Sequence, residues 1–278
     1  MATGDAVSRT AAWIDREYGR EKWPAIERFI DEAIAAEGPR PDLARVIRTV
    51  SRHERGWGGA AAEPAQVALN GVVTAAPRAA AVGAYLTVIP EVVVDACRDN
   101  GAELIVDIGS GWGQHLLTVW LAGGPRHATY VAAEYTEAGR RAAARLAALA
   151  SEISFRAVPF DLHAPDLSVL GTVSSAVVLT VHAIEQAPSV DAAFFDAVLG
   201  LAPVVRGVHF EPIGWQMRPG EDTASRAYAE RNDYNRNLWS LLRAEADGGR
   251  IRIDTVVADA VGLNPQHPTS LVTWTSQP

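Results

Sequence analysis

Ten residues, Val106–His115, have the clearest chemical pattern in the sequence, VDIGSGWGQH. The apolar run Leu104–Val106 leads into them, and a second apolar run, Leu116–Leu121, follows. An aliphatic strand that turns into a helix through alternating glycines lets the backbone approach a nucleotide-like ligand closely. We therefore predict a cofactor site at this turn, with contacts from Asp107, Gly109, Ser110, Gly111 and Gly113.

The spacing within the turn separates two kinds of ligand. Gly109, Gly111 and Gly113 stand at every second position, and not in the G-x-G-x-x-G spacing of dinucleotide enzymes. Asp107, two residues before the first glycine, would repel a pyrophosphate but suits a ligand that carries an ammonium group. An NAD(P)-dependent Rossmann oxidoreductase is the alternative, although it would need the other spacing and no acid here.

Two further acids follow the next two apolar runs. The run 128–133 ends at Glu134, where a carboxylate can accept hydrogen bonds from both hydroxyls of a ribose, and Tyr135 follows it. The run 153–159 is followed by Phe160 and Asp161, an aromatic ring and an acid that can frame an adenine and accept its amino hydrogen bond. Three acids at three successive strand ends strengthen the prediction of a nucleoside cofactor.

The region from about residue 100 to 276 resembles the class I S-adenosylmethionine-dependent methyltransferases. The resemblance implies that S-adenosylmethionine is the cofactor, with Asp107 at its methionine end, Glu134 at the ribose, Asp161 at the adenine and Thr180 beside the sulfonium. It also implies a small-molecule acceptor, in bacterial secondary metabolism. A non-catalytic methyltransferase-fold binding subunit is a further alternative, but such a subunit would usually have lost the acid or the glycines.

Candidate groups for the acceptor follow the fourth and fifth apolar runs, 175–179 and 203–210. Ligands of open α/β sheets bind at the carboxyl ends of the strands, so we predict His182, His209 and Glu211 as catalytic residues. A histidine base suits an acceptor that loses a proton, which slightly favours O- or C-methylation over N-methylation. No metal is assigned, and a metal held by His209, Glu211 and His267 is the alternative to a base. His267 otherwise reads as an exposed turn residue, and Glu185 as a helix start.

The periodicity of the chain predicts a mostly parallel α/β sheet of seven strands, the Rossmann-like methyltransferase sheet, in residues 99–278. Five strands alternate with helices, and the runs 251–258 and 270–275 form a terminal antiparallel hairpin. Residues 226–242 are predicted as one helix. Residues 1–98 are predicted as a helical subdomain, in which 75–97 forms two helical stretches broken at Pro90 and 52–57 is a possible lid tip. By resemblance this subdomain covers the acceptor pocket; a packing subdomain or a homodimer surface is equally compatible.

Composition describes an ordinary α/β enzyme. The chain has 278 residues, 48% of them hydrophobic and 21% charged, which is enough apolar material for a full core. The formal net charge of -8 argues against a nucleic-acid partner, because nucleic-acid binders usually present a basic surface. The single cysteine, Cys97, excludes an intramolecular disulfide. We find neither a signal peptide nor an apolar run of membrane-spanning length, and so expect a cytoplasmic protein without a membrane partner.

Overall fold

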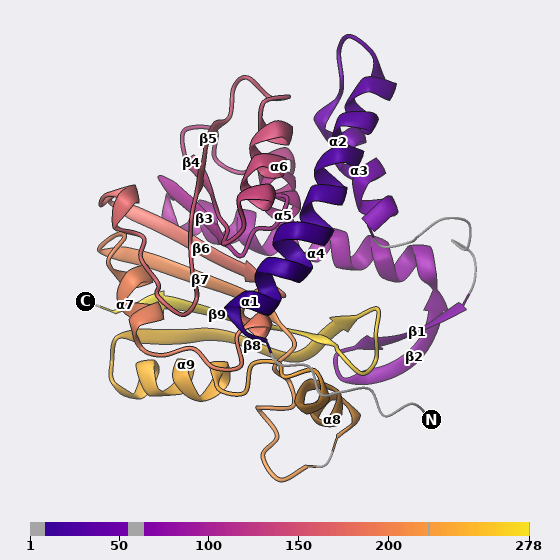
Figure 1. The fold of residues 1–278 in the computed structure, drawn as a ribbon. Helices are drawn as coiled ribbons and strands as arrows, with labels where there is room; N and C mark the ends of the chain where they lie inside the picture. Colours follow the sequence, from indigo (N-terminus) through magenta and orange to yellow (C-terminus); the bar gives the residue numbers. More distant parts are fainter. Residues whose placement is uncertain (1–8, 55–63, 222, 278) are drawn as a thin grey trace.

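The computed structural model describes residues 9–54, 64–221 and 223–277. Within them one mixed sheet is flanked by helices (Figure 1). The strands are β1 Pro64–Leu69, β2 Val72–Pro77, β3 Leu104–Ile108, β4 Thr129–Ala133, β5 Ser154–Val158, β6 Ser175–Val181, β7 Val204–Glu211, β8 Ile251–Gly262 and β9 Thr269–Ser276. The α-helices are α1 Ala11–Ile14, α2 Trp23–Glu37, α3 Leu43–Glu54, α4 Arg78–Asn100, α5 Gln114–Leu121, α6 Glu137–Ala147, α7 Ala193–Leu199, α8 Ala224–Arg231 and α9 Leu238–Asp247.

The strand order is β2-β1-β8-β9-β7-β6-β3-β4-β5. Strands β3 to β7 are parallel, whereas β9 pairs antiparallel with β7, and β8 antiparallel with β9. A dinucleotide-binding Rossmann sheet runs in the order 3-2-1-4-5-6 with parallel strands, so the antiparallel β9 inserted beside β7 sets this sheet apart from it. The seven strands β3 to β9 confirm the predicted class I methyltransferase sheet.

Two apolar cores lie on the two faces of the sheet. Helices α4 to α6 pack on one face, with α2 and α3 packed on the outside of α5 and α6, whereas α7 and α9 cover the other face. Along β3, Leu104, Val106 and Ile108 belong to the second core, whereas Ile105 belongs to the first. Because side chains alternate along a strand, Asp107 points to the same face as Ile105, toward the N-terminal helices.

The sequence predicted a helical subdomain in residues 1–98, but the structure also has two strands there. Strands β1 and β2 form an antiparallel hairpin that extends the sheet beyond β8, so that the described strands number nine. The boundary at residue 98 lies inside α4, which runs unbroken through Pro90. The segment predicted as one helix over 226–242 is two helices, α8 and α9. Of the possible lid tip, residues 55–57 lie outside the described residues.

Helix α4 is long and apolar enough, by length and composition, to span a membrane, which the sequence reading did not anticipate. In the fold it packs against α5, β6 and β7. Its side chains Ile89, Val93 and Cys97 are almost fully buried in the first core. These contacts are those of a core helix, and burial raises the pKa of the Cys97 thiol to about 12, as expected for a thiol that packs as an apolar residue.

Candidate functional site

The glycine turn after β3 requires glycine at its odd positions. Gly109, Gly111 and Gly113 have φ of +69°, +53° and +80°, a region that side chains with a Cβ rarely adopt. A Cβ on Gly109 would lie 2.4 Å from the Ala183 Cβ, and one on Gly111 would lie 2.7 Å from the Trp23 Cζ2. The bare backbone is thus enclosed between the start of α2 and the segment that follows β6.

Two buried oxygen atoms beside this turn have no hydrogen-bond partner among the described residues. They are the Asp107 Oδ2 and the Ser110 Oγ. Burial first, and then the charge of Glu134, raises the pKa of Asp107 well above its ordinary value. A buried carboxylate with an unused acceptor atom fits a ligand that brings a cationic donor.

Glu134 supports the turn and also faces the cavity. Its Oε2 accepts a hydrogen bond from the Gly111 amide at 3.0 Å, and its Oε1 accepts from the Thr136 amide at 2.9 Å and hydroxyl at 2.7 Å. Because each carboxylate oxygen offers two lone pairs, Oε2 keeps acceptor capacity for a ligand. Tyr135 follows it, with 37% of its surface exposed.

The cavity at this edge of the sheet has a volume of about 470 Å³. Its lining includes seven of the predicted cofactor residues: Gly109, Ser110, Gly111, Glu134, Tyr135, Phe160 and Asp161. Asp107 is only 1% exposed and is not one of the lining residues. The Asp161 Oδ1 accepts a hydrogen bond from the His163 amide at 2.8 Å. The structure therefore brings the ends of β3, β4 and β5 to one cavity, as the sequence predicted.

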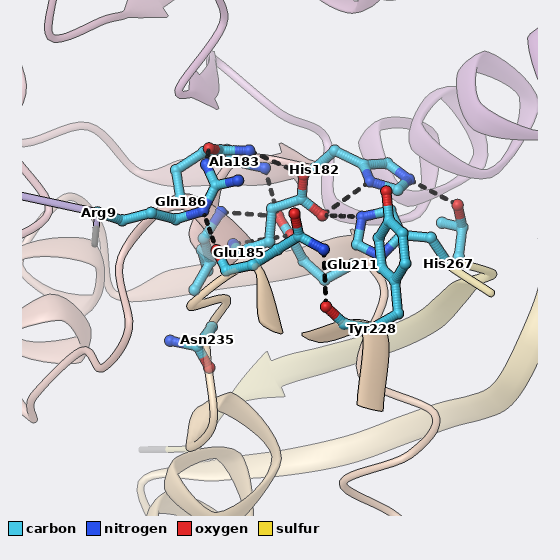
Figure 2. A network of polar contacts seen from close by, with 12 residues as sticks. Arg9, His182, Ala183, Glu185, Gln186, Glu211, Tyr228, Asn235 and His267 are labelled. Atoms are coloured by element: carbon cyan, nitrogen blue, oxygen red, sulfur yellow. Dashed lines mark hydrogen bonds and ion pairs between the residues drawn. The ribbon is translucent and has the colours of Figure 1, made fainter. Parts of the chain in front are cut away.

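A cluster of two histidines and one acid, His182, Glu185 and His267, also lines the cavity. Figure 2 shows the polar contacts that join these three residues. The Glu185 Oε2 lies 3.0 Å from the His182 Nδ1 and 2.7 Å from the His267 Nε2. Burial alone would raise the pKa of Glu185, but the two imidazoles outweigh it and lower that pKa to about 2. His182 has a φ of +52°, which is uncommon for a residue other than glycine and marks a constrained position. His182 is thus one of the residues that line the cavity, and its catalytic role stays a prediction.

Glu211 does not line the cavity, so the structure does not support its predicted catalytic role. Its carboxylate is fully buried and accepts hydrogen bonds from three successive amides, those of Ala183, Ile184 and Glu185, at 3.0, 3.1 and 3.3 Å. Burial, followed by the charge of Glu185, raises the pKa of Glu211 to about 7. Glu211 is therefore a positioning residue, which holds the turn that carries His182 and Glu185.

Three further predicted site residues also lie away from the cavity. His209 is fully buried: its Nδ1 lies 2.9 Å from the Thr180 Oγ1, and its Nε2 accepts from the Trp274 Nε1 at 2.8 Å. Both ring nitrogens are thus engaged inside the core, so neither His209 as a base nor Thr180 beside the cofactor is supported. Gly113 faces α6, where an added Cβ would lie 2.8 Å from the Ala143 Cβ, and so it serves packing.

Several cavity-lining residues were not identified from the sequence. The N-terminal segment contributes Tyr18, Lys22 and Trp23, of which the first two lie in a π-helix, Asp15–Lys22, that joins α1 to α2. Single-turn π-helical segments within helices frequently occur at functional sites, but no local sequence signal marks this one. Thr269, the first residue of β9, also lines the cavity, together with Asn264 and His267 of the connection between β8 and β9.

No family model and no curated protein sequence matches the chain. Solved structures match it over most of its length at low identity. The O-methyltransferase of Bacillus cereus in complex with SAH has 12% identity and a TM-score of 0.49, with 93% of this chain and 99% of that chain covered. The O-methyltransferase TomG of Streptomyces achromogenes, involved in tomaymycin synthesis and in complex with SAM, has 15% identity and a TM-score of 0.48, with 90% and 97% covered.

A third similar structure is the magnesium protoporphyrin IX methyltransferase of Synechocystis PCC 6803 with bound SAH. It has 15% identity and a TM-score of 0.47, with 72% of this chain and 87% of that chain covered. The class is defined by the strand order: the chain has the class I S-adenosylmethionine-dependent methyltransferase fold, with a hairpin added at one edge.

Proposed function

We propose that this protein transfers a methyl group from S-adenosylmethionine to a small-molecule acceptor. The observation that carries this proposal is that one cavity joins the glycine turn after β3, and the acids Glu134 and Asp161 after β4 and β5, to the His182 cluster at the end of β6. The part of the cavity at the glycine turn suits a nucleoside with an ammonium group, and the part at the His182 cluster offers groups that can accept or donate a proton. The bound cofactor supplies an already activated methyl group.

On the cofactor side, each proposed role follows from the contacts. Asp107, whose Oδ2 has no partner among the described residues, would accept from the ammonium group, and Glu134 would accept from the ribose hydroxyls. Phe160 and Asp161 would hold the adenine. The glycine turn would admit the ligand against bare backbone, and Trp23 would exclude water above it.

On the acceptor side, oxygen and carbon are favoured over nitrogen because a hydroxyl or an acidic carbon must lose a proton. The cluster of His182, Glu185 and His267 is the group in the cavity wall that is suited to take part in this step. The Glu185 carboxylate, held against both imidazoles, stabilises positive charge that develops on either ring. The N-terminal segment, through Tyr18 and Lys22, would cover the bound acceptor.

Calorimetry with the full chain tests the cofactor assignment. We expect binding of S-adenosylmethionine and of its demethylated product, and no competition from NAD. Asp107→Asn should weaken both by about 1–3 kcal/mol, because a buried polar group of the ligand loses its charged partner. Asp166→Asn, at an exposed carboxylate, is the matched control and should bind as the wild type does. Binding of NAD in place of S-adenosylmethionine would refute the assignment.

Turnover against a mixed panel of hydroxylated, keto-acid and amine acceptors tests the acceptor side. His182→Ala should lower turnover by about 10²–10⁴-fold with nearly unchanged cofactor affinity. His127→Ala, at an exposed histidine that does not line the cavity, should leave turnover close to wild type. Full activity of the His182 variant on an amine acceptor would mean that alignment alone drives transfer, and would contradict the preference for oxygen or carbon.

A further inference from the structure

The side chains of His182, Glu185 and His267, which line the proposed acceptor side of the cavity, lie close together although they come from separate elements. His182 directly follows β6, Glu185 lies in the short 3₁₀ turn Ile184–Gln186, and His267 comes from the connection between β8 and β9. One ligand-type atom from each lies within 4.8 Å of the other two. Figure 2 shows both imidazoles directed at the same carboxylate. His182 and Glu185 are neighbours in the sequence, but His267 lies 82 residues from Glu185, so only the folded chain brings all three together.

The spacing of these atoms fits a bound metal ion. A transition metal holds imidazole nitrogen and carboxylate oxygen at about 2.0–2.2 Å, which places neighbouring ligand atoms roughly 3 Å apart. The two nitrogen-to-oxygen separations in the cluster are 3.0 and 2.7 Å. Only small side-chain movements would therefore bring the three atoms to coordination distance.

Each member of the cluster is held in orientation by a further contact. The His182 Nε2 lies 2.7 Å from the Thr269 Oγ1, and the Gln186 Nε2 donates to the Glu185 Oε1 at 2.8 Å. The His267 ring stacks on Tyr234, with 4.7 Å between ring centroids. Metal-binding histidines commonly use their second ring nitrogen in such a hydrogen bond, which fixes the ring orientation.

The charge of the cluster also favours a cation. Glu185 is 6% exposed, and its ion-pair partners within the described part of the chain are the two histidines. With both imidazoles neutral the group has a net charge of about -1 in a mostly enclosed wall, and a buried charge needs a counter-charge or a metal. Two imidazoles and one carboxylate suit zinc, iron, cobalt or nickel better than magnesium or calcium, which prefer oxygen ligands.

We propose that His182, Glu185 and His267 bind one divalent first-row transition-metal ion, whose open positions face the cavity and take an oxygen atom of the acceptor. This goes beyond the proposed methyl transfer, because metal binding at the cluster requires neither cofactor nor turnover. With the ion bound, the imidazoles act as ligands, and the ion becomes the positive charge that favours a deprotonated acceptor.

Titration of the full-length, tag-free protein with Co²⁺ alone, in the absence of cofactor and acceptor, tests the site by the visible absorption of the bound ion. We expect saturation at one ion per chain, displacement by Zn²⁺, and no displacement by excess Mg²⁺. Glu185→Gln and His267→Ala should abolish the saturable signal. Thr269→Val keeps all three ligands but removes the outer hydrogen bond, and should weaken binding by about 10–100-fold.

The exposed His127 gives the matched control, and His127→Ala should bind Co²⁺ as the wild type does. Absence of a saturable signal in the folded wild type would overturn the proposal, as would equal Co²⁺ affinity in the wild type and the folded His267→Ala variant. The cluster would then be a hydrogen-bonded arrangement of acid and bases. Because no cofactor is present, either result is independent of whether the protein binds S-adenosylmethionine.

Discussion

At the scale of the residue, the environment of His209 predicts a pH dependence of stability. The Trp274 Nε1 can only donate a hydrogen bond, so the His209 Nε2 must accept and remain unprotonated in the folded protein. Burial lowers the pKa of His209 to about 4, whereas the same imidazole in the unfolded chain titrates near its ordinary value of 6.5. Between these two values the unfolded state binds more protons, and stability therefore falls as the pH falls.

Chemical denaturation between pH 7.5 and pH 4 measures this effect. The stability contributed by neutral His209 should be complete above about pH 6.5 and decrease by roughly 3 kcal/mol toward pH 4, at about 1.4 kcal/mol per pKa unit. His209→Gln should be less stable at neutral pH but should lack this part of the slope. His127→Gln, at an exposed histidine, should keep the wild-type slope. Parallel pH profiles for the wild type and His209→Gln would contradict the assignment.

His209 also shows what could not be predicted from the sequence for a single residue. Strand alternation correctly places His209 and Glu211 on one face of β7. It does not indicate that the Trp274 side chain, from the neighbouring strand β9, covers this face beside Gly207, whose missing Cβ leaves room for the indole ring. The acids at the ends of β3, β4 and β5 were predictable because each directly follows its own strand. Of the partners of His182, Glu185 lies three residues away and could have been paired with it from the sequence, whereas Thr269 lies 87 residues away and no local pattern indicates it.

At the scale of the element, the glycine turn and α2 depend on each other. An alanine at Gly111 would add the strain of a positive φ and would also collide with Trp23 at the start of α2. Gly171 has a φ of +72° and nothing within 4 Å of an added Cβ, so Gly171→Ala gives the strain alone, about 1–2 kcal/mol. Gly111→Ala should lose more stability than this control in thermal denaturation. Its affinity for the cofactor should also fall by about tenfold or more. Equal cofactor affinity in the two variants would mean that Trp23 does not shape the site.

The elements themselves were predicted unevenly, for identifiable reasons. Most of strands β3 to β7 are apolar runs separated by helices, and β8 and β9 are two runs separated by a short turn-rich segment, and both patterns are strong signals. The β1–β2 hairpin has a signal that was overlooked: Asn70-Gly71, with φ of +48° and +77°, is a two-residue turn between apolar runs. The unbroken course of α4 through Pro90 has no such signal, because its packing on the sheet outweighs the helix-breaking preference of proline.

At the scale of the whole molecule, Arg9 joins the N-terminal segment to the connection between α8 and α9. Its guanidinium lies 4.4 Å from the Trp13 ring centroid and 4.1 Å from that of Tyr234. Its Nε donates to the Asn232 carbonyl at 2.7 Å, and its backbone amide donates to the Asp233 carboxylate at 3.1 Å. Arg9 also donates to Gln186, beside Glu185. The Arg9 side chain therefore links the N-terminal helices to the segment that carries Glu185 of the His182–Glu185–His267 cluster.

Removal of this link should loosen the N-terminal segment without unfolding the sheet. In Arg9→Ala, we expect amides of residues 11–22 to exchange hydrogen about 10- to 100-fold faster, because the lost cation–π and charged hydrogen bonds stabilise the closed segment by roughly 1.4–2.8 kcal/mol. Arg16→Ala, which changes an exposed arginine on the same segment, is the control and should exchange as the wild type does.

Because Tyr18 and Lys22 line the cavity, the Arg9 variant should also show a raised KM for the acceptor while exchange in β3, β4 and β6 stays slow. Faster exchange throughout the sheet would instead make Arg9 a determinant of global stability, and an unchanged KM with a loosened segment would remove the N-terminal helices from acceptor binding.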